Sequence, residues 1–446
     1  MPAKRNILLI NPWIYDFTAY DFWMKPLGLL YVAALLASHT NFNLDFIDCL
    51  DRSHPSLPGK LSTKKDGRGP FYKEEVTKPL VLANIPRKFS RYGLPLPLFQ
   101  KELDRVPSPD LVLLSCMMTY WYPGVRTMVD QVRLKFGQVP IILGGVYPTI
   151  LPHHALAQTG VDRICEGPAE NQVFSLINEV LGDGTCPELH FERLEDMPFP
   201  AFSLLRDTNS LPILTSRGCP MRCSFCASFL LCDRFEQRST DSVLRELELA
   251  CRLYRTKNIA FYDDALLWNK KRHMIPLMKR ILEKRLSMSF HTPNGLHVGE
   301  IDDQMAFLLK RSGFQSLYLS QETFDENLIG ESCPKVSSDD LDRALGCLER
   351  AGFIREQVNV YLIVGLPGQS ASGVRDAVSQ VRSLGARARL AFFSPIPGTS
   401  DWKKLVSRGI VSEDDDPLFQ NKLVFPYKWG DISPRELESL KMMLSS

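Results

Sequence analysis

Apolar residues in the N-terminal third recur in short runs that alternate with longer amphipathic segments. Short apolar runs predict buried strands, and apolar positions spaced three and four residues apart predict helices. The predicted strands cover residues 6–10, 43–49, 110–115, 140–143 and 161–165, and the predicted helices cover residues 27–38, 125–136 and 169–181. Short strands that alternate with helices indicate an α/β protein with a parallel, doubly wound sheet, whose ligands lie beyond the carboxyl ends of the strands.

The same alternation returns in the second half of the chain. The predicted strands cover residues 211–215, 258–262, 288–291, 316–320, 359–364 and 390–393, and the predicted helices cover residues 241–255, 270–284, 302–312, 339–351, 370–384 and 401–407. A proline-containing stretch with little periodicity separates the two halves, as a linker would. We therefore expect domains at 1–185 and 210–400, a linker at 186–209 and a short helical tail at 401–446.

One long connection, residues 51–109, interrupts the first domain and is rich in proline, glycine and basic residues. Connections of this length in a compact domain are usually functional lids or disordered segments. Its aromatic residues, including Phe71 and Phe89, argue against full disorder. Two interpretations remain open, a lid over a cofactor or substrate and a solvated, mobile insertion.

Composition excludes several classes of protein. Lys and Arg number 53 against 51 Asp and Glu, and a net charge of +2 gives no footprint for nucleic acid or an anionic membrane. The longest apolar run, residues 27–37, is shorter than the roughly 20 residues that span a bilayer. The 11 cysteines, three of them clustered, do not suggest a disulfide framework. We expect a reduced, cytoplasmic protein without a membrane span.

The clustered cysteines are Cys219, Cys223 and Cys226, separated by three and two residues. Soft thiolates suit iron–sulfur clusters, and four-iron clusters normally take four protein sulfurs. A structural zinc site also needs a fourth ligand, and Cys232 has the spacing of neither kind of site. The short spacings would let one tight loop aim three thiolates at one point. Three ligands leave one metal position open for chemistry.

This triplet, within Thr215-Ser216-Arg217-Gly218-Cys219-Pro220-Met221-Arg222-Cys223-Ser224-Phe225-Cys226, resembles the signature of radical S-adenosylmethionine (SAM) enzymes. The resemblance implies a partial (β/α)6 TIM-like barrel formed by the six β/α units. It also implies a 4Fe-4S cluster on the three cysteines, with SAM bound at the open iron. An external electron donor such as flavodoxin or ferredoxin would reduce the cluster, and SAM would be cleaved to a 5′-deoxyadenosyl radical.

The same resemblance assigns further residues at the carboxyl ends of the barrel strands. Of the adjacent Asp263 and Asp264, one could meet a cation while the other caps the next helix. His291 and Asn294, after the third strand, could orient SAM or the substrate, or serve as hydrogen-bonded scaffolding. Cys333, in a polar loop, is a candidate for a redox or radical role. The residues expected to contact SAM are Phe225, Tyr262, Asp263, Asp264, Ser320, Glu322 and Gly365.

The first domain resembles the cobalamin-binding domains that are fused to many radical SAM enzymes, and residues 194–202 resemble the connector of that family. Paired glycines allow a backbone to lie close under a flat ligand. The residues that carry this resemblance are Asn11, Ser115, Gly144, Gly145, Tyr147, Pro148 and Thr149. The loop that supplies a histidine to cobalt in other cobalamin proteins is absent, since no histidine lies between Asn11 and Ser38. Cobalamin would therefore bind without a histidine on cobalt.

Together the resemblances imply a radical SAM enzyme that uses methylcobalamin to methylate an unactivated carbon of a small molecule. One alternative is a cobalamin-dependent rearrangement or cyclisation, and another is a radical SAM enzyme whose N-terminal domain binds no cobalamin. A tRNA methylthiotransferase would need an N-terminal cysteine motif and an RNA-binding module, which the sequence does not show. A non-catalytic iron–sulfur electron carrier would not need the barrel-strand motifs.

Overall fold

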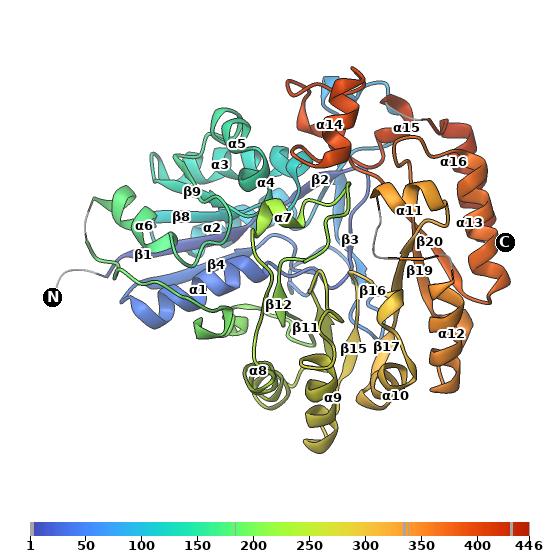
Figure 1. Ribbon diagram of the computed structural model, residues 1–446. Helices are drawn as coiled ribbons and strands as arrows, with labels where there is room; N and C mark the ends of the chain where they lie inside the picture. Colours follow the sequence, from blue (N-terminus) through green and yellow to red (C-terminus); the bar gives the residue numbers. More distant parts are fainter. Residues whose placement is uncertain (1–3, 183, 333–335, 338, 429–430, 446) are drawn as a thin grey trace. The chain divides into compact units, whose positions relative to one another are not determined.

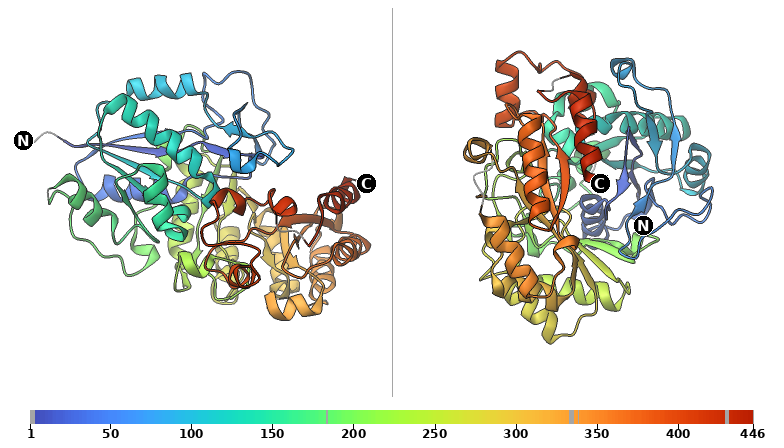
Figure 2. Two further views of the ribbon diagram at one scale, coloured as in Figure 1. Left: turned by 90° about the horizontal axis from the view of Figure 1, so that it is seen from above. Right: turned by 90° about the vertical axis from the view of Figure 1, so that its right-hand side faces the viewer.

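The computed structural model describes residues 4–182, 184–332, 336–337, 339–428 and 431–445, so Cys333 lies outside the described residues. The chain divides into two compact units. Unit 1 comprises Met1–Asn209 with Leu230–Cys232, and unit 2 comprises Ser210–Phe229 with Asp233–Ser446. Figures 1 and 2 show both units. The expected linker belongs to unit 1, because Leu194 and Phe202 are buried there.

Unit 1 contains the predicted parallel sheet, with strand order β10-β9-β8-β1-β4. Its strands are β1 (Asn6–Asn11), β4 (Asn43–Asp48), β8 (Leu111–Ser115), β9 (Ile141–Gly144) and β10 (Arg163–Ile164). The main helices are α1 (Leu27–His39), α3 (Tyr122–Phe136), α5 (Pro152–Thr159) and α6 (Val173–Leu181). Strand β1 lies between β4 and β8, which are the next two strands of this sheet along the chain. The connection after β1 leads to β4 on one side, and the connection after β8 leads to β9 on the other, so the adjacent carboxyl ends of β1 and β8 form a topological switch point.

Alternate residues of these strands enter two separate cores, because successive side chains of a strand point to opposite faces. Leu8 and Ile10 pack with α3 on one face of the sheet. Ile7 and Leu9 pack with α1 and α6 on the other face. In Figure 1, α1 and α3 accordingly lie on opposite sides of the strands. The sheet is doubly wound, as the hydrophobic pattern predicts.

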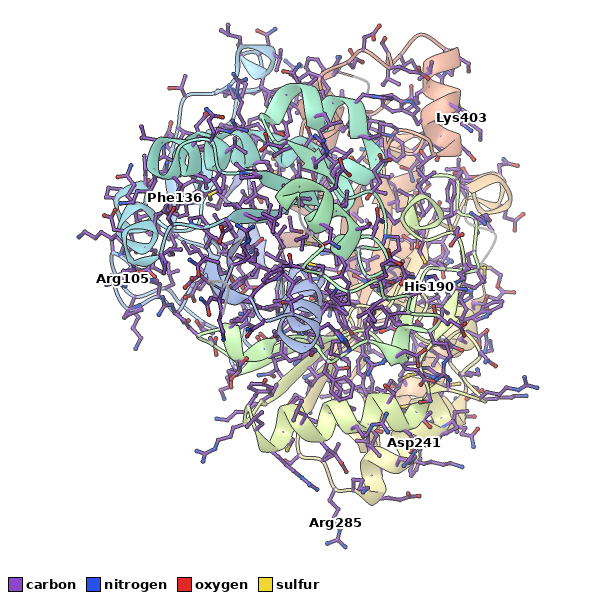
Figure 3. All side chains as sticks on the ribbon, turned by 90° about the vertical axis from the view of Figure 1, so that its left-hand side faces the viewer. Arg105, Phe136, His190, Asp241, Arg285 and Lys403 are labelled. Carbon is purple, nitrogen blue, oxygen red and sulfur yellow. The ribbon has the colours of Figure 1, made fainter. Side chains whose placement is uncertain are left out.

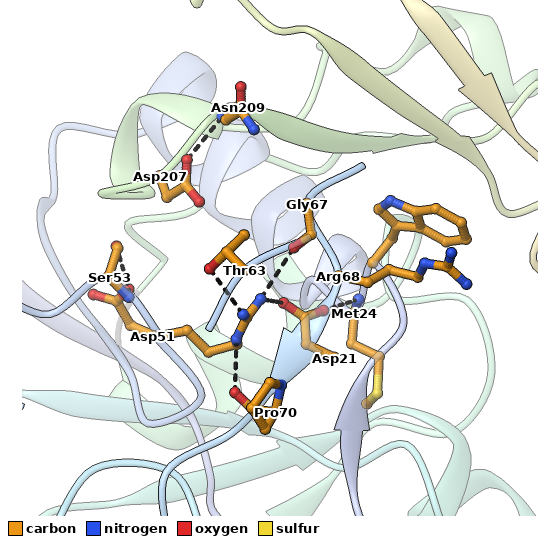
Figure 4. A network of polar contacts seen from close by, with 12 residues as sticks. Asp21, Met24, Asp51, Ser53, Thr63, Gly67, Arg68, Pro70, Asp207 and Asn209 are labelled. Carbon is orange, nitrogen blue, oxygen red and sulfur yellow. Dashed lines mark hydrogen bonds and ion pairs between the residues drawn. The ribbon is translucent and has the colours of Figure 1, made fainter. Parts of the chain in front are cut away.

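The long connection of unit 1 contains regular secondary structure. It supplies β5 (Gly69–Pro70), β6 (Lys73–Glu75), η1 (Leu80–Leu82), β7 (Ser90–Tyr92) and α2 (Leu96–Arg105). These pair in part with β2 (Ile14–Asp16) and β3 (Tyr20–Asp21). Arg52 donates hydrogen bonds to Asp21 and to the carbonyls of Gly67 and Pro70, which hold the segment in place (Figure 4). The α2 helix packs beside α3, and Figure 3 labels their last residues, Arg105 and Phe136.

Unit 2 contains six β/α units in the predicted order, and its strands form two four-stranded sheets, β11-β14-β15-β17 and β16-β18-β19-β20. The strands are β11 (Ser210–Ile213), β14 (Asn258–Phe261), β15 (Ser289–His291), β16 (Leu296–His297), β17 (Phe314–Ser316), β18 (Tyr318–Glu322), β19 (Asn359–Val364) and β20 (Arg387–Phe392). The helices between them are α8 (Thr240–Arg252), α9 (Met274–Glu283), α10 (Asp303–Ser312), α11 (Glu326–Ser332), α12 (Asp340–Arg350) and α13 (Ala371–Ser383). In Figure 1, helices α8, α9, α10, α12 and α13 lie outside the strands. This arrangement confirms the predicted partial barrel.

Two of the predicted barrel strands show instructive differences from the prediction. The fourth is interrupted at Leu317, so that β17 pairs with β15 and β18 pairs with β19. This break lets the parallel ladder turn from one sheet to the next. The sixth, β20, begins at Arg387, three residues before the predicted start. Its alternating arginines and alanines conceal the strand from a search for apolar runs.

The tail contains α14 (Ser400–Ser407), η7 (Pro417–Gln420), α15 (Phe425–Lys428) and α16 (Pro434–Ser445). Trp402 and Leu405 of α14 pack with Leu366 and Phe393, which follow the last two barrel strands. The tail is therefore part of the core of unit 2. Across the described ranges, no helix combines the length and the apolar character that crossing a bilayer requires.

Candidate functional site

The three clustered cysteines lie on one loop of unit 2, between the short antiparallel strands β12 (Ser216–Arg217) and β13 (Glu236–Gln237). We call residues 215–226 the cysteine loop. Gly218 begins its turn with φ +77°, and a Cβ there would lie 2.6 Å from the carbonyl oxygen of Arg234. Only glycine tolerates both conditions. Local sterics therefore require glycine at the position before Cys219.

Cys219, Cys223 and Cys226 line one cavity of about 290 Å³ at the carboxyl ends of the barrel strands. This is the end of a β/α barrel where reacting groups gather. The other lining residues are Met221, Phe225, Asp264, Ala265, Leu266, Leu267, Trp268, Asn294, Gly295, His297, Glu300, Ser320 and Glu322. The fold thus brings the cysteines together with five other predicted site residues, namely Phe225, Asp264, Asn294, Ser320 and Glu322.

The three cysteines share one cavity. In the part of the chain that the structure describes, no three His, Cys, Asp or Glu side chains are arranged to hold one metal ion. Iron–sulfur clusters are held by cysteine thiolates, and each thiolate of a four-iron cluster binds a different iron, so the three sulfurs need not converge. Cys232 is not among the lining residues described. Three thiols on one cavity therefore fit a cluster with one open iron better than a single ion.

The two adjacent aspartates have different surroundings. Asp264 is exposed to the cavity, where its carboxylate accepts a hydrogen bond from Ser228 Oγ. Asp263 is buried and does not line the cavity. Its Oδ1 accepts hydrogen bonds from Thr215 Oγ1 and Ser216 Oγ, both at 2.6 Å. Burial raises the pKa of Asp263, and these hydrogen bonds partly offset the effect. Of the pair, only Asp264 is placed to meet a bound cation.

Ser320 and Glu322 both line the cavity from β18, and Gln321 between them is not among the lining residues described. Glu322 has φ +67°, a left-handed conformation that is unusual for a non-glycine residue. The register with β19 shifts between Ser320 and Glu322, as at a β-bulge. Backbone strain of this kind gathers at functional sites. Gly365 does not line the cavity, and its N–H donates to Gln369 Oε1 at 2.7 Å within a turn.

The two residues predicted after the third strand also differ. His291 is buried and its Nε2 lies 3.0 Å from Asn258 Oδ1, so the expectation that it faces a substrate is not met. It is hydrogen-bonded scaffolding within the sheet. Asn294 lines the cavity, and its Nδ2 donates to the carbonyl of Tyr262 at 2.8 Å. This bond ties the end of the third strand to that of the second, and it involves the backbone of Tyr262 rather than its ring.

The cavity residues that were not predicted as site residues include the polar or aromatic Trp268, His297 and Glu300. All three lie within ten residues of the end of β14 or β15, and this position is the signal that could have indicated them. His297 Nδ1 accepts a hydrogen bond from the N–H of Gly299 at 3.0 Å. The neutral ring therefore carries its proton on Nε2. This places one more donor group on a residue that borders the cavity.

In unit 1, Asn11 and Ser115 line a small cavity at the switch point between β1 and β8. Asn11 Nδ2 also donates to Asp48 at 2.7 Å, and burial raises the pKa of Asp48 from 3.8 to about 6. Cys116 borders the same cavity, and burial raises the pKa of its thiol to about 12. Burial likewise raises the pKa of the Cys165 thiol to about 12, so both thiols are inert at neutral pH.

The other five residues of the predicted cobalamin set form the loop after β9 and the start of α4 (Val146–Ile150). Gly145 has φ +100°, and a Cβ there would lie 2.6 Å from the carbonyl oxygen of Cys116. Thr149 Oγ1 donates to the Gly145 carbonyl and accepts from the N–H of Gly167, both at 2.8 Å. Tyr147 is fully buried, with its hydroxyl 2.6 Å from His154 Nδ1. Gly144, Gly145, Tyr147, Pro148 and Thr149 thus shape the edge of the sheet without lining the cavity.

Two family models match the chain. The radical SAM superfamily matches residues 213–381, and the B12 binding domain matches residues 100–176. An uncharacterized methyltransferase of Pyrococcus horikoshii is 26% identical over 68% of this chain and 71% of that protein. The cytidylyl-2-hydroxyethylphosphonate methyltransferase of Streptomyces wedmorensis is 22% identical over 96% of this chain and 86% of that protein.

Two solved structures share the fold. The radical SAM methyltransferase TsrM from Kitasatospora setae, with tryptophan substrate and a SAM analog bound, has a TM-score of 0.69 and 15% identity. The alignment covers 98% of this chain and 89% of TsrM. The cobalamin-dependent SAM radical enzyme OxsB, with aqua-cobalamin and SAM bound, has a TM-score of 0.57 and 13% identity. That alignment covers 96% of this chain and 56% of OxsB.

Proposed function

Because the chain belongs to the radical SAM superfamily and carries a B12-binding domain, we propose that it is a cobalamin-dependent radical SAM methyltransferase. Its substrate would be a small molecule that is methylated at an unactivated carbon. The observation that carries this proposal is the cavity where three cysteines meet polar groups from several barrel strands. The methyltransferase names of its curated relatives support the choice of methyl transfer.

Cys219, Cys223 and Cys226 would hold a 4Fe-4S cluster and leave its fourth iron for SAM. When bound, the cluster supplies the electron that cleaves SAM to a 5′-deoxyadenosyl radical. Asp264 offers a negative charge to the amino group of SAM, and Ser320 and Glu322 offer hydrogen-bonding groups to its ribose or carboxylate. An external one-electron donor such as flavodoxin or ferredoxin, in a reducing compartment such as the cytoplasm, completes the proposal.

The apolar part of the cavity has a separate role. The residues from Ala265 to Trp268 follow directly on Asp264 and line the cavity together with Phe225. Apolar walls exclude water, which would otherwise compete for polar contacts and quench reactive species. We therefore assign these side chains to shielding, with Phe225 placed beside the adenine of SAM.

In unit 1, Asn11 and Ser115 would contact cobalamin at the switch point. The loop of Gly144, Gly145, Tyr147, Pro148 and Thr149 would shape the adjoining edge. The fit of this loop to cobalamin rests on Gly145, whose φ is positive and where a side chain would collide with the backbone of Cys116.

The test uses full-length protein purified without oxygen, with the cluster reconstituted and hydroxocobalamin supplied during expression. Bound corrinoid is measured first, and 5′-deoxyadenosine is measured after addition of reductant and SAM. We expect stoichiometric corrinoid and SAM cleavage that Cys223→Ala abolishes. Cys232→Ala is the matched control, because this thiol does not line the cavity, and it should cleave SAM normally.

Other outcomes separate the alternatives. SAM cleavage without corrinoid would contradict methylcobalamin chemistry and favour a structural N-terminal domain. S-adenosylhomocysteine formed together with 5′-deoxyadenosine marks methyl transfer, because a second SAM must remethylate cobalt. A corrinoid-dependent rearrangement or cyclisation would form 5′-deoxyadenosine alone. A full cluster that cleaves no SAM would indicate an electron carrier.

A further inference from the structure

We propose that Asp263 and Asp401 are positioning residues that hold the cysteine loop from two sides. The inference rests on one part of the proposed function, namely that the cysteine loop holds a cluster. Both carboxylates are buried, and neither lines the cavity. Each forms hydrogen bonds to residues of the cysteine loop that are not themselves ligands.

Asp263 holds the beginning of the loop. Besides its two bonds from hydroxyl groups, its carboxylate accepts from the backbone N–H of Thr215 at 3.1 Å. His273, just before α9, lies with Nε2 2.9 Å from Thr215 Oγ1. Thr215 and Ser216 are almost fully buried. The end of β14 and the start of α9 thus fix the backbone four residues before the first cysteine.

Asp401 holds the loop between its second and third cysteines. Ser224, which follows Cys223, donates from Oγ to Asp401 Oδ2 at 2.7 Å. In return, the N–H of Asp401 donates to the carbonyl of Ser224 at 3.0 Å. The two residues are 177 positions apart in the sequence. The first turn of α14, in the tail, is therefore attached to the loop by a reciprocal pair of hydrogen bonds.

The chemistry of these bonds explains why carboxylates are used. Hydrogen bonds to an ionised acceptor are stronger than neutral ones, and they are stronger still away from water. Residues that orient metal ligands through such bonds typically change metal affinity by about 10- to 100-fold when they are replaced. The two aspartates therefore restrict the loop so that its three thiols remain on one cavity wall before a cluster binds.

The test replaces each carboxylate by its amide in the full chain, as Asp263→Asn and Asp401→Asn. After anaerobic reconstitution, the rate of iron loss to a chelator and the EPR spectrum of the reduced cluster are measured. We expect iron loss to be about tenfold faster in both variants, with a changed EPR signal. Iron loss at the wild-type rate with an unchanged spectrum would overturn the inference.

The control separates positioning from general loss of stability. Asp302 caps α10 by accepting from the N–H of Met305 at 2.8 Å, and it forms an ion pair with Lys270, outside the cysteine loop. Asp302→Ala should lower the melting temperature yet release iron at the wild-type rate. Suppose that Asp302→Ala has the same melting temperature as the two amide variants and also loses iron as fast as they do. Stability alone would then set the rate of iron loss, and the inference would be overturned.

Two smaller changes apply if the amide variants do not fold. Ser216→Ala and Ser224→Ala each remove one hydroxyl donor to these carboxylates. Both should speed iron loss, and wild-type rates in both would contradict the inference. A wild-type protein that takes up no cluster would instead refute the proposed function, so the two failures are distinguishable.

Discussion

At the scale of single residues, neighbouring positions with the same side chain have different roles. Asp263 and Asp264 differ because the chain leaves a strand at this point, and successive side chains point in different directions. One is buried beneath the cysteine loop and the other is exposed to the cavity. The carboxylate that meets solvent is the one available to a charged ligand. Sequence alone indicates the pair but not the division of labour.

Replacement of Asp264 should therefore weaken SAM binding without loss of the cluster. A charge-assisted hydrogen bond contributes about 1.5–3 kcal/mol, so Asp264→Asn should raise the Kd for SAM by roughly tenfold or more. Equilibrium dialysis of reconstituted protein with SAM measures this change, and iron content verifies the cluster. Asp303→Asn, at an exposed position of α10, is the control and should bind SAM normally. An unchanged Kd for Asp264→Asn would contradict the assignment.

At the scale of elements, turns after parallel strands determine how closely two segments approach. The paired glycines after β9 look equivalent in the sequence, but the structure separates them. A Cβ at Gly145 would collide with the carbonyl oxygen of Cys116 at 2.6 Å, whereas one at Gly144 would make ordinary contact at 3.8 Å. Gly145 also has a positive φ, which side chains rarely adopt.

Gly145→Ala should consequently destabilise unit 1, while Gly144→Ala should have little effect. Backbone strain and steric overlap together should cost about 1–3 kcal/mol. Urea unfolding followed by circular dichroism measures the shift in midpoint for each variant. Equal midpoints for the two variants would show that the loop relaxes without cost, and that the close approach is not needed.

At the scale of the whole molecule, parts of the chain that are remote in sequence complete each unit. Residues 51–109 form a folded layer on the first unit, and the tail supplies Trp402 and Asp401 to the second. Burial within a folded unit also changes the pKa of a carboxyl group. Asp48 is the clearest case in unit 1, because burial raises its pKa from 3.8 to about 6.

This shift predicts how stability depends on pH. Between about pH 4 and pH 6 the folded state binds the Asp48 proton and the unfolded state does not, so this residue makes folding less favourable as pH rises. The contribution is at most about 3 kcal/mol and is constant above pH 6. Asp48→Asn keeps an acceptor for Asn11 and should remove this part of the pH dependence.

Melting temperatures of wild type and Asp48→Asn, measured from pH 4.5 to pH 7.5, test the prediction. The wild type should lose stability relative to the variant up to about pH 6, and the difference should then stay level. A difference that is independent of pH would mean that Asp48 titrates normally. Because the chain has two units, the transition assigned to unit 1 is the one to compare.

The sequence by itself determined the class of the fold and the core of the site. Hydrophobic periodicity and cysteine spacing are local properties, so they identified the doubly wound sheet, the six β/α units and the residues Cys219, Cys223 and Cys226. The positions of most strands and helices followed for the same reason. Strand bounds were less exact, most clearly at β20, which begins three residues before its apolar run.

Only the tertiary structure decided which side chains meet. It placed Asp264 rather than Asp263 on the cavity, left His291 inside the sheet, and brought Asp401 to Ser224. Whether a side chain at a strand end faces the cavity depends on local twist and bulges, as at Glu322. A bond between residues 177 positions apart depends on the path of the whole chain. Neither property is encoded in a short window of sequence, because each arises from packing between elements.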